Sequence, residues 1–298
     1  MSLTTVNKLT ARWWLRIIIF LLVTIGTFPL LKVIFQKQHY SLLNVFPSML
    51  AESSIMLLIV LLISIIIESL RKEGKWHTFG IMPGKWMIFD IGMGAALNAG
   101  ITFILLGFTL IFNAFKTEPS VFDNGYFWTI TLLLFVEAAF EELLFRGIMF
   151  QALLERFGIF SAIIASSIVF ALGHIVNPNV SIFAIINIIL AGVMFAAMYI
   201  KTYSLWLPIS FHFFWNWSQA VLGSDVSGIN FNISLINIDW QSLPGWLFGS
   251  SFGLEGGILA TIFIISSTII TLKYSNVSPY LASILFKRRY AESLITLK

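Results

Sequence analysis

The chain has 298 residues, of which 58% are hydrophobic and only 11% are charged, whereas soluble domains carry roughly 25% charged residues. This composition excludes a water-soluble globule. The formal net charge is +4 and no cysteine is present, so disulfides, thiolate nucleophiles and thiolate metal sites are excluded as well. Any chemistry in this chain must therefore use oxygen and imidazole nitrogen.

Long apolar runs recur along the whole chain. Each bilayer crossing needs about 20 apolar residues, so the sequence predicts an all-α, polytopic integral membrane protein in which residues 1–298 form a single membrane domain. Strands are excluded, because an open sheet cannot satisfy its backbone in lipid and the runs lack the alternation of barrel strands. The eight predicted helices cover residues 13–35, 47–69, 86–113, 127–151, 158–176, 181–200, 204–222 and 248–272.

Lysine and arginine gather in alternate connections between these helices. Because an excess of basic residues marks the cytoplasmic side, the pattern predicts a multi-pass cell-membrane protein with its N- and C-termini in the cytoplasm. The same placement accounts for the positive charge, so we expect the lipid bilayer as a partner and no nucleic acid. The residues that set this orientation are Lys8, Arg12, Arg16, Arg71, Lys72, Lys75, Lys85, Arg156, Lys201, Lys273, Lys287, Arg288 and Arg289.

Two connections have a composition of their own. Residues 71–86 mix aromatic with basic side chains, a composition typical of a segment that lies at the lipid headgroups. Residues 222–246 contain several asparagines together with Asp239, Trp240 and Pro244. We expect this second stretch to form an outer loop that packs over the helix ends.

The predicted fourth helix carries four ionisable residues, which are rare inside a membrane and have a functional role by default. Glu142 and Arg146 are four residues apart, on one helix face and within ion-pair reach, so we expect them to neutralise each other. Glu141 is rotated about 100° from Glu142, which leaves its carboxylate free to act as a general base on water. Glu137 either shares a proton with Glu141 or bonds to another helix.

His174, at the end of the fifth predicted helix, and His212, on the seventh, are the histidines that fall within helices. A single buried histidine is usually structural, but two beside a glutamate pair indicate a site. His212 and Asn216 share one helix face, so their imidazole and amide can converge on a substrate carbonyl oxygen as an oxyanion hole. The alternative is that Asn216 bridges two helices by hydrogen bonding.

The depths of these groups in the membrane do not match at first sight. If the fifth helix starts near Gly158 at the inner side, a rise of 1.5 Å per residue puts His174 roughly 24 Å higher, near the outer face. Glu141 lies nearer the inner half. Either the helix boundaries are wrong, or the fifth helix is tilted, short and set deep, so that His174 ends it inside a water-filled cavity. We favour the second explanation.

Three short motifs carry these residues: EELLFR at 141–146, FALGH at 170–174 and HFFWN at 212–216. In this order and spacing they resemble the EExxxR, FxxxH and HxxxN signatures of the CPBP family, the CAAX proteases and bacteriocin-processing enzymes. The resemblance covers residues 127–222, the predicted catalytic core. It implies an eight-helix intramembrane endopeptidase.

The resemblance also implies a role for each motif residue: a water activated by Glu141 and His174, an oxyanion stabilised by His212 and Asn216, and support from Glu142 and Arg146. Family members are commonly labelled metalloproteases, and Glu141, His174 and His212 could supply the ligands of a divalent metal such as zinc. Yet the sequence contains no HExxH, and a water activated by Glu and His needs no ion. We therefore expect no tightly held zinc.

The sequence thus predicts a CPBP-type endopeptidase that hydrolyses a peptide bond near the C-terminus or the leader junction of a membrane-attached protein or peptide. Peptide maturation and immunity to a bacteriocin are both compatible with such an activity. One alternative is a non-catalytic membrane immunity or scaffold protein with the same fold. Another is a proton-coupled transporter, which would carry inverted repeats or matched broken helices, and the sequence contains neither.

Overall fold

The computed structural model describes residues 13–36, 42–70, 80, 81, 83, 85–116 and 123–274. Within these ranges the regular structure is helical, and strand pairing is limited to two isolated bridges, Phe115 with Ile238 and Val226 with Ile229. The all-α prediction is confirmed. The helices are α2 (Trp13–Gln36), α3 (Leu42–Ser69), α4 (Lys85–Ile111), α5 (Asn124–Arg146), α6 (Ile148–Phe157), α7 (Ile159–Gly173), α8 (Ile182–Thr202), α9 (Trp206–Val221), α10 (Gly245–Phe248) and α11 (Ile258–Tyr274).

Several of these helices have the length and composition of membrane spans. In the described part of the chain, three segments are long and apolar enough to cross a bilayer: Phe46–Ser69, Trp86–Ile111 and Ile182–Thr202. Shorter apolar helices cover Trp13–Thr27, Ile159–Gly173 and Ile258–Lys273. Large apolar side chains point outward, as expected of surfaces that face lipid rather than water; Phe103 and Phe160 are 75% and 77% exposed. The membrane assignment holds, and the count of eight crossings stays a prediction.

The predicted orientation depends largely on residues that lie outside the described ranges. These are Lys8, Arg12, Arg71, Lys72, Lys75, Lys287, Arg288 and Arg289, and most of the segment 71–86 lies outside them too. The cytoplasmic placement of the termini and the interfacial position of that segment therefore stay predictions.

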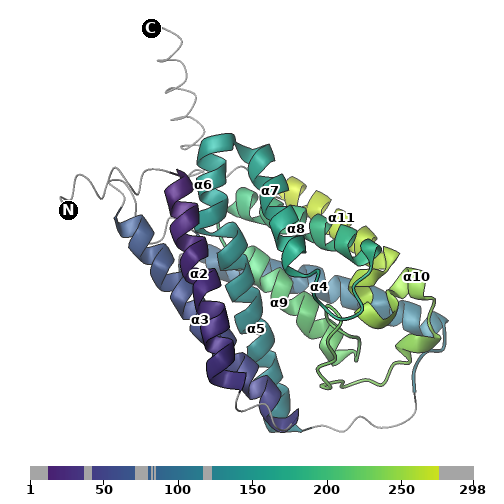
Figure 1. Cartoon of the computed structure of the whole chain (residues 1–298). Helices are drawn as coiled ribbons and strands as arrows, with labels where there is room; N and C mark the ends of the chain where they lie inside the picture. The colour runs from purple at the N-terminus through teal and green to yellow at the C-terminus, as the bar shows by residue number, and fades with distance from the viewer. Residues whose placement is uncertain are drawn as a thin grey trace.

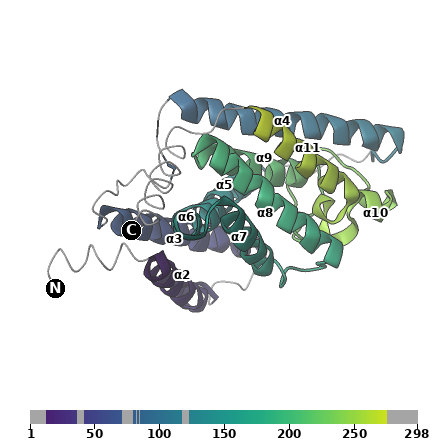
Figure 2. The same ribbon diagram turned by 90° about the horizontal axis from the view of Figure 1, so that it is seen from above.

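Helices α5 and α9, which carry two of the three motifs, lie in the middle of the bundle together with α8. Helices α2 and α3 flank them on one side, and α4 and α11 lie on the other (Figures 1 and 2). The pairs that pack against each other include α3 with α5, α4 with α9, α7 with α8, and α8 with α11. Two of the three helices that carry the candidate site, α5 and α9, are thus enclosed by the rest of the chain, whereas α7 keeps large apolar side chains such as Phe160 and Leu172 on the surface.

The predicted fourth helix, 127–151, is wrong at its end. The chain breaks at Gly147, between α5 and α6, and helical structure then continues to Phe157 (Figure 1). Gly147 adopts ψ −127°, and an added Cβ would lie 2.2 Å from the carbonyl oxygen of Leu143. Only glycine fits such a close approach, so this residue determines where the break occurs.

The break at Gly147 also explains why Glu141 and His174 lie at the same depth in the membrane. Helix α6 carries the chain a further 10 residues before it turns at Gly158, and α7 then returns over 15 residues to end next to His174. Glu141 precedes Gly158 by nearly as many residues as separate Gly158 from His174, and both arms advance about 1.5 Å per residue. The two side chains therefore reach one level, and the mismatch came from the helix boundary predicted at 151 rather than from the preferred explanation of a tilted, deep fifth helix.

The outer loop packs against the helix ends, as its composition predicted. Phe231, Ile233 and Ile238 are buried, and the indole Nε1 of Trp240 donates to the carbonyl of Leu222 at 2.8 Å. The last predicted helix, 248–272, begins too early, because residues up to Gly256 form short helical turns and α11 begins at Ile258.

Helices α7 and α8 are in close contact at Gly192, which gives a first testable prediction. A Cβ at this position would lie 2.8 Å from both Cα and Cβ of Ser167, so Gly192→Ala must push the two helices apart. We expect it to lower the free energy of unfolding by about 1–3 kcal/mol, measured by titration of the detergent-solubilised protein with dodecyl sulfate and circular dichroism.

Gly100 in α4 is the matched control, because no atom lies within 4 Å of the Cβ that an alanine would add there. Gly100→Ala is expected to leave the free energy of unfolding unchanged or to raise it by up to about 1 kcal/mol. Equal destabilisation by both substitutions would contradict the close packing of α7 against α8.

Candidate active site

Three helices bring the motif residues together around the carboxylate of Glu141. Its Oε2 lies 3.9 Å from Nε2 of His174, at the end of α7, and 3.9 Å from Nε2 of His212, in α9. These distances are too long for direct hydrogen bonds. Oε2 of Glu141 is buried and has no hydrogen-bond partner within the described ranges, so this oxygen can still accept a hydrogen bond.

Arg146 is held at the base of the site by polar and aromatic contacts. Its guanidinium donates to Oε1 of Glu142 at 3.1 Å and to the carbonyl of Gly192 at 3.2 Å, and both ionic side chains are fully buried. The guanidinium carbon also lies 4.5 Å from the ring centroid of Phe170, a distance at which a cation is attracted to the ring face. The charges of Glu142 and Arg146 therefore compensate each other, which leaves Glu141 without a fixed cation.

Each histidine ring is oriented through its Nδ1. Nδ1 of His174 lies 2.8 Å from the carbonyl oxygen of Phe170, and since a carbonyl only accepts, this nitrogen carries the hydrogen. Nδ1 of His212 lies 3.0 Å from Oε1 of Glu142 and donates to that carboxylate in the same way. In both rings Nε2 is then the nitrogen that faces Glu141, as a lone pair in the neutral form.

Aromatic rings fix the planes of both imidazoles. Phe195 stacks on His212 with centroids 4.9 Å apart and an angle of 23°, and Phe170 packs against His174 at 4.7 Å. Phe170 is the first residue of the FALGH motif, so this motif supplies the carbonyl that binds His174, a ring that packs on it and a surface for Arg146.

Asn216 and Glu137 lie on the two site helices, one turn from His212 and one turn from Glu141. Asn216 lies on the same α9 face as His212, and its Oδ1 is buried without a hydrogen-bond partner in the described part of the chain. Glu137 accepts a hydrogen bond from the hydroxyl of Ser53 in α3 at 3.3 Å. Of the two interpretations of Glu137, the bond to another helix is therefore present.

Glu255, which lies in the 3₁₀ turn Leu254–Gly256, was not among the residues predicted from the sequence. Its Oε1 accepts from Nε1 of Trp215 at 3.1 Å and from Nε2 of Gln219 at 3.3 Å, and its Oε2 accepts from the hydroxyl of Ser227. A signal was available, because Glu255 is an ionisable residue inside the apolar run predicted for 248–272.

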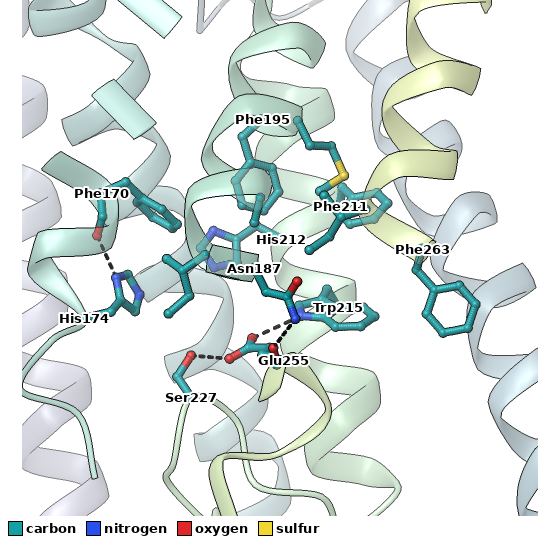
Figure 3. A pocket seen from close by; sticks show the side chains of 14 residues that line it. Phe170, His174, Asn187, Phe195, Phe211, His212, Trp215, Ser227, Glu255 and Phe263 are labelled. Atoms are coloured by element: carbon teal, nitrogen blue, oxygen red, sulfur yellow. Dashed lines mark hydrogen bonds between the residues drawn. The ribbon is translucent and has the colours of Figure 1, made fainter. Parts of the chain in front are cut away.

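A cavity of about 40 Å³ opens beside the two histidines (Figure 3). This is more than the roughly 10–15 Å³ that one water needs. The walls combine the imidazoles with a few polar groups and many apolar side chains: Phe170, His174, Asn187, Ile188, Ala191, Met194, Phe195, Phe211, His212, Trp215, Ser227, Glu255, Phe263 and Ile264.

The three groups considered as metal ligands are too far apart for zinc as they stand. Two ligand atoms at zinc bond lengths and a tetrahedral angle lie about 3.4 Å from each other, whereas Glu141 Oε2 lies 3.9 Å from each imidazole nitrogen. Among the described residues, no group of three or more histidine and carboxylate side chains has the spacing of a metal site. The arrangement of Glu141, His174 and His212 thus does not fit a bound zinc.

Comparison with protein families gives one match. Residues 123–218 match the model of the Rce1-like family, described as type II CAAX prenyl endopeptidase Rce1-like, over about a third of the chain. Comparisons with curated proteins and with solved structures give no match. The family match implies a CAAX-protease-like intramembrane peptidase and confirms the resemblance to the CPBP family. All three motifs, and with them the six side chains predicted from the sequence, thus lie in an Rce1-like segment that runs from the start of α5 into α9.

Proposed function

We propose that this chain is an intramembrane endopeptidase that hydrolyses a peptide bond of a membrane-associated protein or peptide through a water activated by Glu141 and His174. The observation that carries the proposal is the pair of 3.9 Å distances from Glu141 Oε2 to the two imidazole Nε2 atoms. A water about 2.8 Å from each atom would bridge these gaps with ordinary hydrogen bonds.

In this reaction the water donates one hydrogen to Glu141 and the other to Nε2 of His174, whose Nδ1 already donates to the Phe170 carbonyl. Glu141 takes the proton as the water oxygen attacks the carbonyl carbon of the substrate. The same carboxyl group then gives the proton to the amine that leaves, which completes general base and general acid catalysis by one residue.

The oxyanion formed by the attack requires donors, and His212 and Asn216 are the residues we assign to it. Because Nδ1 of His212 donates to Glu142, the ring can donate from Nε2 only as an imidazolium. The Glu142 carboxylate accepts the Nδ1 hydrogen of that form, and Arg146 fixes the carboxylate in turn. The side-chain amide of Asn216 supplies the second donor.

The proposal is tested with the purified protein in detergent and a library of membrane-associated peptides. We expect the wild type to cut a subset of them and His174→Ala to lower kcat by about 100-fold, within the range of general acid and base groups. Thermal unfolding of both proteins shows whether the variant remains folded. Activity is expected to survive a chelator, and loss of activity with recovery on added zinc would show a metal-dependent reaction instead.

The alternative hypothesis, a non-catalytic immunity or scaffold protein, predicts a different result. In that case the wild type cuts no peptide, and Glu141→Ala and His174→Ala still give the cellular phenotype of the wild type. Such a result would overturn the peptidase assignment, because the phenotype would then need neither hydrolysis nor the two side chains assigned to it.

A further inference from the structure

Glu255 brings a negative charge to the cavity beside the two histidines (Figure 3). Its hydrogen bonds come from an indole, an amide and a hydroxyl, all of them neutral: Trp215, Gln219 and Ser227. The carboxylate differs in this respect from Glu142, which is paired with Arg146. Across the described ranges, no Lys, Arg or His forms an ion pair with Glu255.

This environment leaves the carboxylate able to accept one more group. A carboxylate offers about four acceptor positions, and the three neutral donors occupy three of them. Glu255 is partly buried, and a charge in such a site is stabilised by an opposite charge brought next to it. A cation that enters the cavity can therefore donate a hydrogen bond to the open acceptor position of Glu255 and is attracted by its negative charge.

The remaining walls define the rest of the ligand. Ile188, Phe263 and Ile264 form an apolar surface in the same cavity. A side chain with an apolar stem and a cationic end, as in lysine and arginine, can cover such a surface while its end reaches a carboxylate. A free C-terminal carboxylate is disfavoured at this position, because Glu255 carries the same charge.

The place where Glu255 contacts α9 sets its distance from the substrate bond that is cut. Its partners Trp215 and Gln219 follow His212 by three and seven residues, which corresponds to about 5–10 Å along the helix. An extended peptide advances about 3.3 Å per residue. The group that meets Glu255 therefore belongs to a substrate residue about one to three positions from the bond that is cut.

We infer that this cavity is a substrate subsite for the cationic end of a lysine or arginine side chain within about three residues of the cleaved bond, recognised by the carboxylate of Glu255. The inference rests on the proposed peptidase function. It names a specificity-determining residue, outside the three motifs, in the turn before α11.

The test uses pairs of peptides that differ only by lysine or norleucine, its uncharged analogue, at each of the three positions on either side of the cleaved bond. We expect kcat/KM of the wild type to be about tenfold higher or more for lysine at one position, the size of a hydrogen bond between charged groups. Glu255→Gln should bring this ratio close to one. Glu255→Asp, which keeps the charge, should restore part of it.

Ser227→Ala is the matched control, because it removes one hydrogen bond of Glu255 and keeps the carboxylate. The ratio of lysine to norleucine should persist in this variant. Suppose that Glu255→Gln lowers activity equally on the lysine and the norleucine peptide. The carboxylate would then only hold the turn against α9, and the inference would be overturned. A wild type that does not distinguish the peptides would overturn it as well.

Failure of the proposed peptidase function can be distinguished from failure of the subsite. If neither peptide is cut, binding of fluorescent peptides is measured by anisotropy with the same variants. Tighter binding of the lysine peptide that depends on Glu255 would keep the subsite and reject the hydrolysis. Equal binding of both peptides would reject the subsite.

Discussion

Glu141→Gln is expected to lower kcat for peptide hydrolysis by about 10³–10⁴-fold, near the upper end of what a general acid or base supplies. Glutamine has nearly the same shape but cannot take a proton from water, so the substitution removes the chemistry and keeps the packing. The measurement is single-turnover cleavage of the best library peptide in detergent. KM should change little, because the loss concerns the transition state more than the bound substrate.

Glu137→Gln is the control for this prediction. Glu137 lies one turn earlier on α5 and bonds to Ser53, whereas Glu141 faces the two imidazoles. We expect its kcat to stay within about tenfold of the wild type. If Glu137→Gln were inactive while Glu141→Gln retained activity, the general base would be Glu137 and the proposed position of the water would be wrong.

Local spacing allowed much of the site to be predicted from the sequence. Residues four apart on a helix share a face, which is why the pairing of Glu142 with Arg146 followed from the spacing and appears in the structure at 3.1 Å. The long apolar runs likewise gave the helical class, because no other backbone structure with such runs is satisfied in lipid. Both inferences needed only the periodicity of one helix.

Features that depend on contacts between distant segments could not be predicted in this way. Gly147 looks like any glycine in an apolar run, and its role appears only when the Leu143 carbonyl is seen against it. His174 reaches the depth of Glu141 only because α6 continues to Phe157. The predicted helix ended at 151 and did not include this extra length. Glu255 meets Trp215 only because the turn before α11 folds back onto α9.

The largest loss of stability is expected from Arg146→Met. Both Arg146 and Glu142 are fully buried, and removal of one partner leaves the other charge unpaired, at a cost of about 3–5 kcal/mol in the free energy of unfolding. The carbonyl of Gly192 also loses its donor. Unfolding of the detergent-solubilised protein with dodecyl sulfate, followed by circular dichroism, measures the change.

The double variant Glu142→Gln/Arg146→Met separates the ion pair from the loss of packing. Neutralising the carboxylate removes the unpaired charge, so the double variant should be more stable than Arg146→Met alone, with a coupling between the two sites that exceeds about 1 kcal/mol. Additive losses would mean that Arg146 stabilises the bundle through Phe170 and Gly192 rather than through Glu142. Because Glu142 also binds His212, the double variant should remain folded and yet lose hydrolysis, which would show that the ion pair stabilises the fold while its carboxylate orients the catalytic ring.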